Sequence, residues 1–265
     1  MQTDSIELGF LSIFALLTFF IFLIVNKYSY RLNNGILLDQ DFKKPQAFHK
    51  EAISRCGGIA SIISLILFFG IYYLLYLQIL YEYIFVGISL FLVGFLDDIK
   101  IKIKPISRLI LIILFLMIFI IFLPIKIYYI DLIFLNFWLH NQIFSSIFIL
   151  FFFLFTINGS NLIDGFNGLL AINLIVINFI LLFINLNNNQ SEFVIFLTAQ
   201  IIILISFLFF NFPKAKIFLG DSGSYLMGSL VALNTIFTNN LNPKISSFFF
   251  FIVLFYLFYE VFFSF

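Results

Sequence analysis

The chain has 265 residues, of which 63% are hydrophobic and only 10% are charged, and its mean hydropathy is +1.16. Soluble domains carry about 25% charged residues, so this composition excludes an ordinary soluble fold and predicts a protein that has lipid as its solvent. The net charge of +1 gives no reason to expect nucleic acid as a partner, and the single cysteine, Cys56, excludes an intramolecular disulfide or a multi-cysteine metal site.

Long apolar runs follow one another along the chain. Lipid offers a bare backbone no hydrogen-bond partners, so these runs are predicted to be helices, some of them extending by a turn to reach the roughly 20 residues of a span. We predict an all-α, polytopic membrane bundle, a single domain over residues 1–265 with about nine transmembrane helices. The predicted spans are Leu8–Val25, Gly57–Leu77, Ile79–Leu96, Leu109–Leu123, Gln142–Ile157, Leu169–Leu186, Phe193–Phe210, Ser224–Thr238 and Ile245–Phe265.

The basic residues divide unequally between the two sides that these spans define. Only Lys126 and Lys244 fall on one side, and the other 12 of the 14 lysines and arginines fall on the opposite side. By the positive-inside rule the side that holds 12 is cytoplasmic. Those residues are Lys27, Arg31, Lys43, Lys44, Lys50, Arg55, Lys100, Lys102, Lys104, Arg108, Lys214 and Lys216.

The first predicted cytoplasmic loop is basic and ends in Gly57-Gly58 at the start of a helix. It contains His49, one of only two histidines; the other, His140, is assigned to the opposite side. Binding of anionic lipid headgroups explains the lysines of this loop equally well.

Two adjacent carboxylates, Asp97 and Asp98, end the third run and are followed by four cations that include Lys104 and Arg108. Negative charge at a helix C-terminus is unfavourable, so the pair costs free energy. The pattern indicates a proton acceptor or a metal-facing pair beside cations that bind phosphate. A solvated helix end followed by a positive-inside stop signal remains the alternative.

The segment Asn158–Leu170 places Asn158, Asn161 and Asp164 one turn apart. In a helix these side chains would share a face, whereas the glycines of the segment favour an irregular loop. The alternative is an ordinary turn rich in asparagine and glycine.

The segment Phe212–Gly228 sets Asp221 between glycines just before an apolar helix. Backbone amides at such a helix start can bind an anion. Ser222 or Ser224 could instead be a simple N-cap.

Oxygen ligands without clustered cysteine or histidine suit Mg²⁺, with Mn²⁺ as the alternative. Mg²⁺ together with lysine and arginine stabilises phosphoryl chemistry. The residues alone therefore predict a metal-dependent enzyme that acts on a phosphate ester at the cytoplasmic membrane surface.

From about Asp39 onward the chain resembles the polyprenyl-phosphate N-acetylhexosamine-1-phosphate transferases. The resemblance rests on the order of three motifs: Asp97-Asp98, then the Asn-x-x-Asn-x-x-Asp-Gly pattern that begins at Asn158, then Phe-Leu-Gly-Asp-x-Gly-Ser around Asp221. It implies a bacterial inner (plasma) membrane enzyme in the lipid bilayer that transfers the sugar phosphate of a UDP-N-acetylhexosamine to undecaprenyl phosphate and releases UMP.

The resemblance also implies roles for individual residues. Asp97 accepts or positions a proton and Asp98 supports the metal shell, while Asn161 and Asp221 are the metal ligands. The residues expected to bind substrate are Asn158, Asp164, Asn167, Lys104, Arg108 and His49.

Two departures from the family pattern bear on the substrate and on the chain end. Ile101 stands where relatives that transfer the muramyl-pentapeptide carry a lysine, which favours an N-acetylglucosamine-1-phosphate transferase of surface polysaccharide or lipopolysaccharide synthesis. The pentapeptide substrate is the alternative. Family members also continue into a His-rich loop and further helices, which are expected to be missing after Phe265.

Two readings from other classes stay open. A transporter would carry charges and broken helices in the middle of the membrane. An inactive membrane scaffold is the other. The sequence also leaves the oligomeric state open, a homodimer included.

Overall fold

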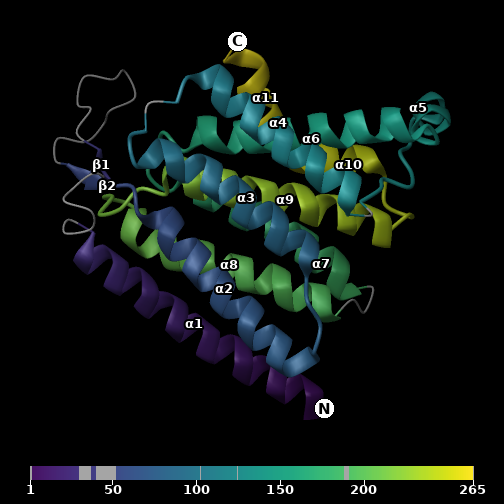
Figure 1. Ribbon diagram of the computed structural model, residues 1–265. Coiled ribbons are helices and arrows are strands. Elements are labelled where there is room, and N and C mark those ends of the chain that lie inside the picture. Colours follow the sequence, from purple (N-terminus) through teal and green to yellow (C-terminus); the bar gives the residue numbers. More distant parts are fainter. Residues whose placement is uncertain are drawn as a thin grey trace.

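The computed structural model describes residues 2–29, 37–39, 52–101, 103–123, 125–187 and 191–264, and it is almost entirely helical (Figure 1). This confirms the predicted all-α membrane class. The elements are α1 (Gln2–Tyr28), β1 (Leu38–Asp39), β2 (Ile53–Ser54), α2 (Gly57–Tyr76), α3 (Tyr81–Asp98), α4 (Pro105–Phe122), α5 (Ile133–Leu139), α6 (Gln142–Ile163), α7 (Leu169–Asn187), α8 (Ser191–Asn211), α9 (Gly220–Leu241), α10 (Ser247–Val253) and α11 (Phe255–Phe263).

Six of the described helices are long and apolar enough to cross a membrane, namely α1, α2, α4, α6, α7 and α8. Helices α3 and α9 have 18 and 22 residues but carry more polar side chains. The predicted count of nine spans is therefore not confirmed.

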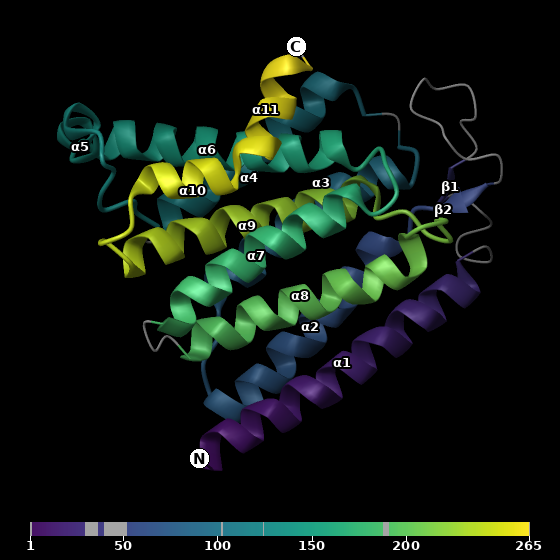
Figure 2. The ribbon, with the colours of Figure 1, turned by 180° about the vertical axis from the view of Figure 1, so that it is seen from behind.

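Helix α9 lies inside the bundle and packs against α2, α3, α6, α7 and α10 (Figures 1 and 2). Nearly all of its residues from Gly220 to Ile236 are buried. Its polar side chains therefore meet other helices rather than lipid, which explains why its sequence is less apolar than its neighbours.

A buried cluster of three amides joins α9 to α7 and α8. The Asn234 Nδ2 donates to Asn178 Oδ1 at 2.9 Å and to Gln200 Oε1 at 2.8 Å. All three side chains are fully buried. Hydrogen bonds of this kind between helices stabilise membrane bundles, because an unpaired amide is costly in an apolar interior.

The last predicted span, Ile245–Phe265, is wrong as a continuous helix. The chain turns at Leu254, and α11 rises away from α10 toward the end of the chain in both views (Figures 1 and 2). At about 1.5 Å per residue, neither a 7-residue nor a 9-residue helix reaches across a bilayer. Helix α11 packs instead on α6. The two helices approach closely at Gly159, where a Cβ would overlap the backbone of Leu257.

The segment that precedes α2 is joined to the loop that precedes α9. Strands β1 and β2 pair antiparallel, and Ser54 forms an isolated parallel bridge to Ile217. The Gly57 amide then donates to Phe218 O at 2.9 Å, and the Gly58 amide donates to Leu219 O at 2.8 Å. These bonds fix the start of α9 at one end of the bundle, which we call the site end. The other end, which carries α5, is called the opposite end (Figure 1).

Candidate active site

Two carboxylates from different helices converge on one guanidinium at the site end. The Nη1 of Arg108, in the first turn of α4, lies 3.1 Å from Asp97 Oδ2 and 2.5 Å from Asp221 Oδ2. The three side chains are 23%, 28% and 17% exposed, so they remain accessible from the surface. The structure therefore brings together three residues that the sequence placed in separate motifs.

Asp98 has a different environment from Asp97, although the two are adjacent in sequence. Its side chain is fully buried, and its carboxylate accepts hydrogen bonds from the backbone amides of Asp221 at 3.0 Å and Ser222 at 2.9 Å. The first amides of a helix have no partner within the helix, and a carboxylate complements their positive end. Asp98 therefore caps α9 from a neighbouring helix, and each of its two carboxylate oxygens accepts one of these amides.

Two glycines allow this close approach of α3 and α9. A Cβ on Gly94 would overlap the backbone of Asp221 and Ser222. Gly220 has φ +77° and faces the Asp98 carboxylate, where a side chain would be both strained and obstructed. Asp221 is placed by backbone contacts that larger residues could not make.

The end of α6 supplies the third side of the site. The helix continues through Ile163, so Asn158 and Asn161 are helical and the loop suggested by the glycines begins only at Asp164. The Ser224 hydroxyl lies 3.0 Å from Asn161 Oδ1 and 3.2 Å from Asp221 O, and it can donate to either. Burial, followed by the negative charges of Asp221 and Asp98, raises the pKa of the half-buried Asp164 well above its ordinary value.

Arg55 is a site residue that the sequence did not single out within its basic loop. Its Nη2 pairs with Asp39 Oδ2 at 2.7 Å, and its Nη1 lies 3.9 Å from Asp98 Oδ1. Burial alone would lower the pKa of Arg55, but the hydrogen bond and charge of Asp39 and the charges of Asp98 and Asp221 raise it. The sequence feature that could have identified Arg55 is its position two residues before Gly57-Gly58, at the start of a helix.

A second feature missed from the sequence is Tyr225, one turn after Asp221. The guanidinium carbon of Arg108 lies 5.8 Å from the centroid of the Tyr225 ring, in a cation–π arrangement. The ring thus helps to hold Arg108 toward the two carboxylates.

Three of the predicted substrate-binding residues that the structure describes are not joined to this cluster by the described contacts. Asn158 donates to Leu154 O in its own helix at 2.7 Å, and Asn167 donates to Pro213 O at 3.1 Å. Lys104 is the exposed N-cap residue of α4. His49 lies outside the described residues, so its predicted role stays a prediction.

Comparison with known proteins assigns the chain to a family. The family model for glycosyl transferase family 4 matches residues 80–239, which include the Asp97, Asn161 and Asp221 motifs. A phospho-N-acetylmuramoyl-pentapeptide-transferase of Dictyoglomus turgidum is 30% identical over 234 residues, covering 82% of this chain and 71% of the relative. Another, from Dictyoglomus thermophilum, is 29% identical over 81% of this chain and 70% of the relative.

Shorter alignments give higher identity. A transferase of the same name from Leuconostoc mesenteroides is 39% identical over 94 residues, which cover 36% of this chain and only 29% of that protein. The resemblance drawn from the motifs is confirmed: this polytopic membrane protein belongs to glycosyl transferase family 4, the phosphosugar transferases.

Proposed function

We propose that the chain transfers a sugar 1-phosphate from a nucleotide diphosphate sugar to a polyprenyl phosphate, at the site end of the bundle. The observation that carries the proposal is the convergence of Asp97 and Asp221 on Arg108. Such a cluster, accessible at a membrane face, suits a reaction in which both substrates bring phosphate groups and one of them is a lipid.

In the proposed reaction, a phosphate oxygen of the polyprenyl phosphate attacks the sugar-bearing phosphorus of the donor. The new bond makes a lipid diphosphosugar, and the bond to the bridging oxygen breaks and releases the nucleoside monophosphate. Arg108 and Arg55 supply positive charge for the phosphates, since guanidinium groups bind phosphate oxygens well. Asp97 accepts or positions the proton of the lipid phosphate, because it is the more accessible member of the Asp97–Asp98 pair.

Asp98 acts in this proposal as a positioning residue. Both of its oxygens accept amides at the start of α9, so it holds Asp221 in place. The role expected from the family resemblance, support of the metal shell, stays a prediction beside this one.

The donor set also supports Mg²⁺ as the cofactor, with Mn²⁺ as the alternative. Mg²⁺ keeps several waters and binds proteins through one or two carboxylates together with substrate phosphates. Within the described ranges no group of three acidic, histidine or cysteine side chains could hold a metal alone. Asp221, with Asp97 or Asn161 beside it, would hold the ion jointly with the donor diphosphate, where the ion would neutralise developing charge.

The names of the relatives favour a different sugar donor from the one that Ile101 favours. The matched proteins are named phospho-N-acetylmuramoyl-pentapeptide-transferases, so we propose a UDP-N-acetylmuramoyl-pentapeptide as the donor and undecaprenyl phosphate as the acceptor. UDP-N-acetylglucosamine, which Ile101 favours, is the second candidate. The charge distribution supports a cytoplasmic site end in a bacterial inner membrane.

Radiolabelled donors offered in parallel to membranes that contain the protein would test the proposal. We expect undecaprenyl phosphate and Mg²⁺ to be required for both lipid product and UMP, with the pentapeptide donor preferred. Product from UDP-N-acetylglucosamine alone would reverse the choice of donor. Solute flux without lipid product would favour a transporter, and neither activity would favour a scaffold.

A further inference from the structure

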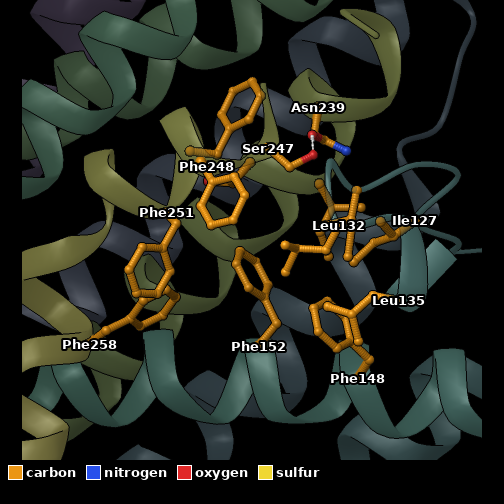
Figure 3. Close-up of a pocket in the computed structure, with 14 residues that line it drawn as sticks. Ile127, Leu132, Leu135, Phe148, Phe152, Asn239, Ser247, Phe248, Phe251 and Phe258 are labelled. Atoms are coloured by element: carbon orange, nitrogen blue, oxygen red, sulfur yellow. Dashed lines mark hydrogen bonds between the residues drawn. The ribbon is translucent and has the colours of Figure 1, made fainter. Parts of the chain in front are cut away.

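An apolar cavity lies at the opposite end of the bundle, away from the candidate active site (Figure 3). It has a volume of about 360 Å³ and is lined by the loop before α5 and by α5, α6, α9, α10 and α11. Volumes of roughly 300–1,000 Å³ are typical of pockets that hold ligands. Its residues have no part in the proposed transfer reaction.

The walls of the cavity are mainly aromatic. Phe152 of α6 packs edge-on against Phe258 of α11, which in turn packs against Phe251 of α10, and Phe148 lies on the other side of Phe152 (Figure 3). Phe258 is only 6% exposed, whereas Phe251 is 47% exposed. The most exposed lining residues, Phe248 and Phe251, both belong to α10, so a lipid chain that enters from the surrounding membrane is expected to pass this helix.

The rim is polar and held by hydrogen bonds between three segments. The Ser247 hydroxyl lies 3.0 Å from Asn239 Oδ1 (Figure 3). The Ser247 amide donates to Asp131 Oδ2 at 2.9 Å. Asn240 accepts from the Tyr128 amide at 3.2 Å and donates to Lys126 O at 2.6 Å. The rim is therefore built before any ligand arrives, which lowers the entropic cost of binding.

Lys126 and Lys244, the two basic residues predicted on the non-cytoplasmic side, both belong to segments of the rim. Lys126 immediately precedes Ile127, which lines the cavity, and Lys244 lies in the turn between α9 and α10, three residues before Ser247. Both side chains are exposed. Among the described residues neither lysine forms an ion pair, and the acidic group of the rim contacts, Asp131, accepts the Ser247 amide.

We propose that this cavity binds one acyl chain of an anionic phospholipid from the leaflet opposite the active site, with the lipid phosphate held near Lys126 and Lys244. An apolar hollow in a membrane protein gains contacts when a hydrocarbon chain fills it and gains little from water. The lysines add attraction for a negatively charged headgroup over a zwitterionic one. The site is separate from the one that binds the polyprenyl phosphate acceptor.

The test uses the full chain purified in mild detergent, with phosphatidylglycerol and phosphatidylethanolamine of identical acyl chains added in turn. Native mass spectrometry would count the bound lipids, and melting curves would report stabilisation. We expect one tightly retained phosphatidylglycerol and a preference over phosphatidylethanolamine that falls roughly tenfold in a Lys126→Gln/Lys244→Gln variant. Both lysines are exposed, so this variant is expected to fold.

Two further variants separate the cavity from general charge effects. Leu135→Trp would fill the cavity and lower retention of both lipids. Lys214→Gln/Lys216→Gln removes two exposed lysines at the site end, and the preference is expected to survive it. An unchanged preference in Lys126→Gln/Lys244→Gln, its loss in the site-end variant, or displacement of the bound lipid by polyprenyl phosphate would overturn the proposal.

Discussion

The carboxylate of Asp98 accepts a hydrogen bond of 2.9 Å from the backbone amide of Ser222, and so the last residue of α3 caps the first turn of α9. The same carboxylate accepts the Asp221 amide at 3.0 Å and lies 3.9 Å from the guanidinium of Arg55. Asp98 therefore joins its own segment to those of Arg55 and Asp221, and any two of these three segments are more than 40 residues apart in the sequence. It also fixes where Asp221 presents its side chain.

Replacing Asp98 by asparagine should mainly reduce stability. Asparagine keeps the shape but has one acceptor oxygen, so one amide of α9 loses its buried partner. We expect the free energy of unfolding to fall by about 1–3 kcal/mol, measured by thermal melting in detergent. The matched control is Asp97→Asn, which should abolish most transfer activity yet change stability by only about 1 kcal/mol or less, because Asp97 is partly exposed. The reverse pattern of stability losses would refute the capping role.

Arg108→Gln should reduce catalytic efficiency. The substitution removes the charge that Asp97 and Asp221 share, and we expect kcat/KM to fall by about 10–100-fold, a range typical for groups that support metal-site carboxylates. Arg108→Lys should recover only part of the loss, because an ammonium lacks the planar fork of a guanidinium. The exposed Lys104, in the same helix start, provides the control. An equal loss in Lys104→Gln would show that the contacts of Arg108 are not what matters.

Gly94→Ala should separate α3 from α9. The added Cβ would overlap the backbone of Asp221 and Ser222, and overpacking of this kind costs about 1–3 kcal/mol. We expect a lower melting temperature together with lower transfer activity. Gly70 offers the matched control, since a Cβ there meets nothing within 4 Å. Gly70→Ala should leave the melting temperature unchanged or raise it slightly, because alanine favours helix. Similar effects of the two substitutions would argue against close packing at Gly94.

Asn234→Leu should destabilise the bundle without changing the site. It removes three hydrogen bonds between helices, two donated by Asn234 and one accepted from Gln200, and leaves Asn178 and Gln200 without this partner in an apolar interior. We expect the Asn234→Leu variant to lose about 1–3 kcal/mol in the free energy of unfolding. Ser229→Ala on the same helix is the comparison, since the Ser229 hydroxyl bonds only to Leu226 O within α9 among the described contacts. Equal losses would mean that the amide cluster adds nothing specific.

The sequence could predict much of the site because its motifs are local. Asp97 and Asp98 were expected at a helix end and are found in the last turn of α3. Asp221 was expected before a helix and lies in its first turn, since α9 begins at Gly220 rather than Ser224. The pattern could not say that adjacent carboxylates would have separate tasks, because that depends on which of them faces the amides of α9.

Composition and the order of the apolar runs determined that this is a helical membrane protein, because only lipid can solvate so many apolar side chains. The motif order also determined its family. Tertiary structure alone decided that Ile245–Phe265 breaks at Leu254, because Gly159 gives Leu257 a place to pack on α6. It alone decided that Arg108 is shared by Asp97 and Asp221, because a distance between side chains on different helices is set by how those helices pack.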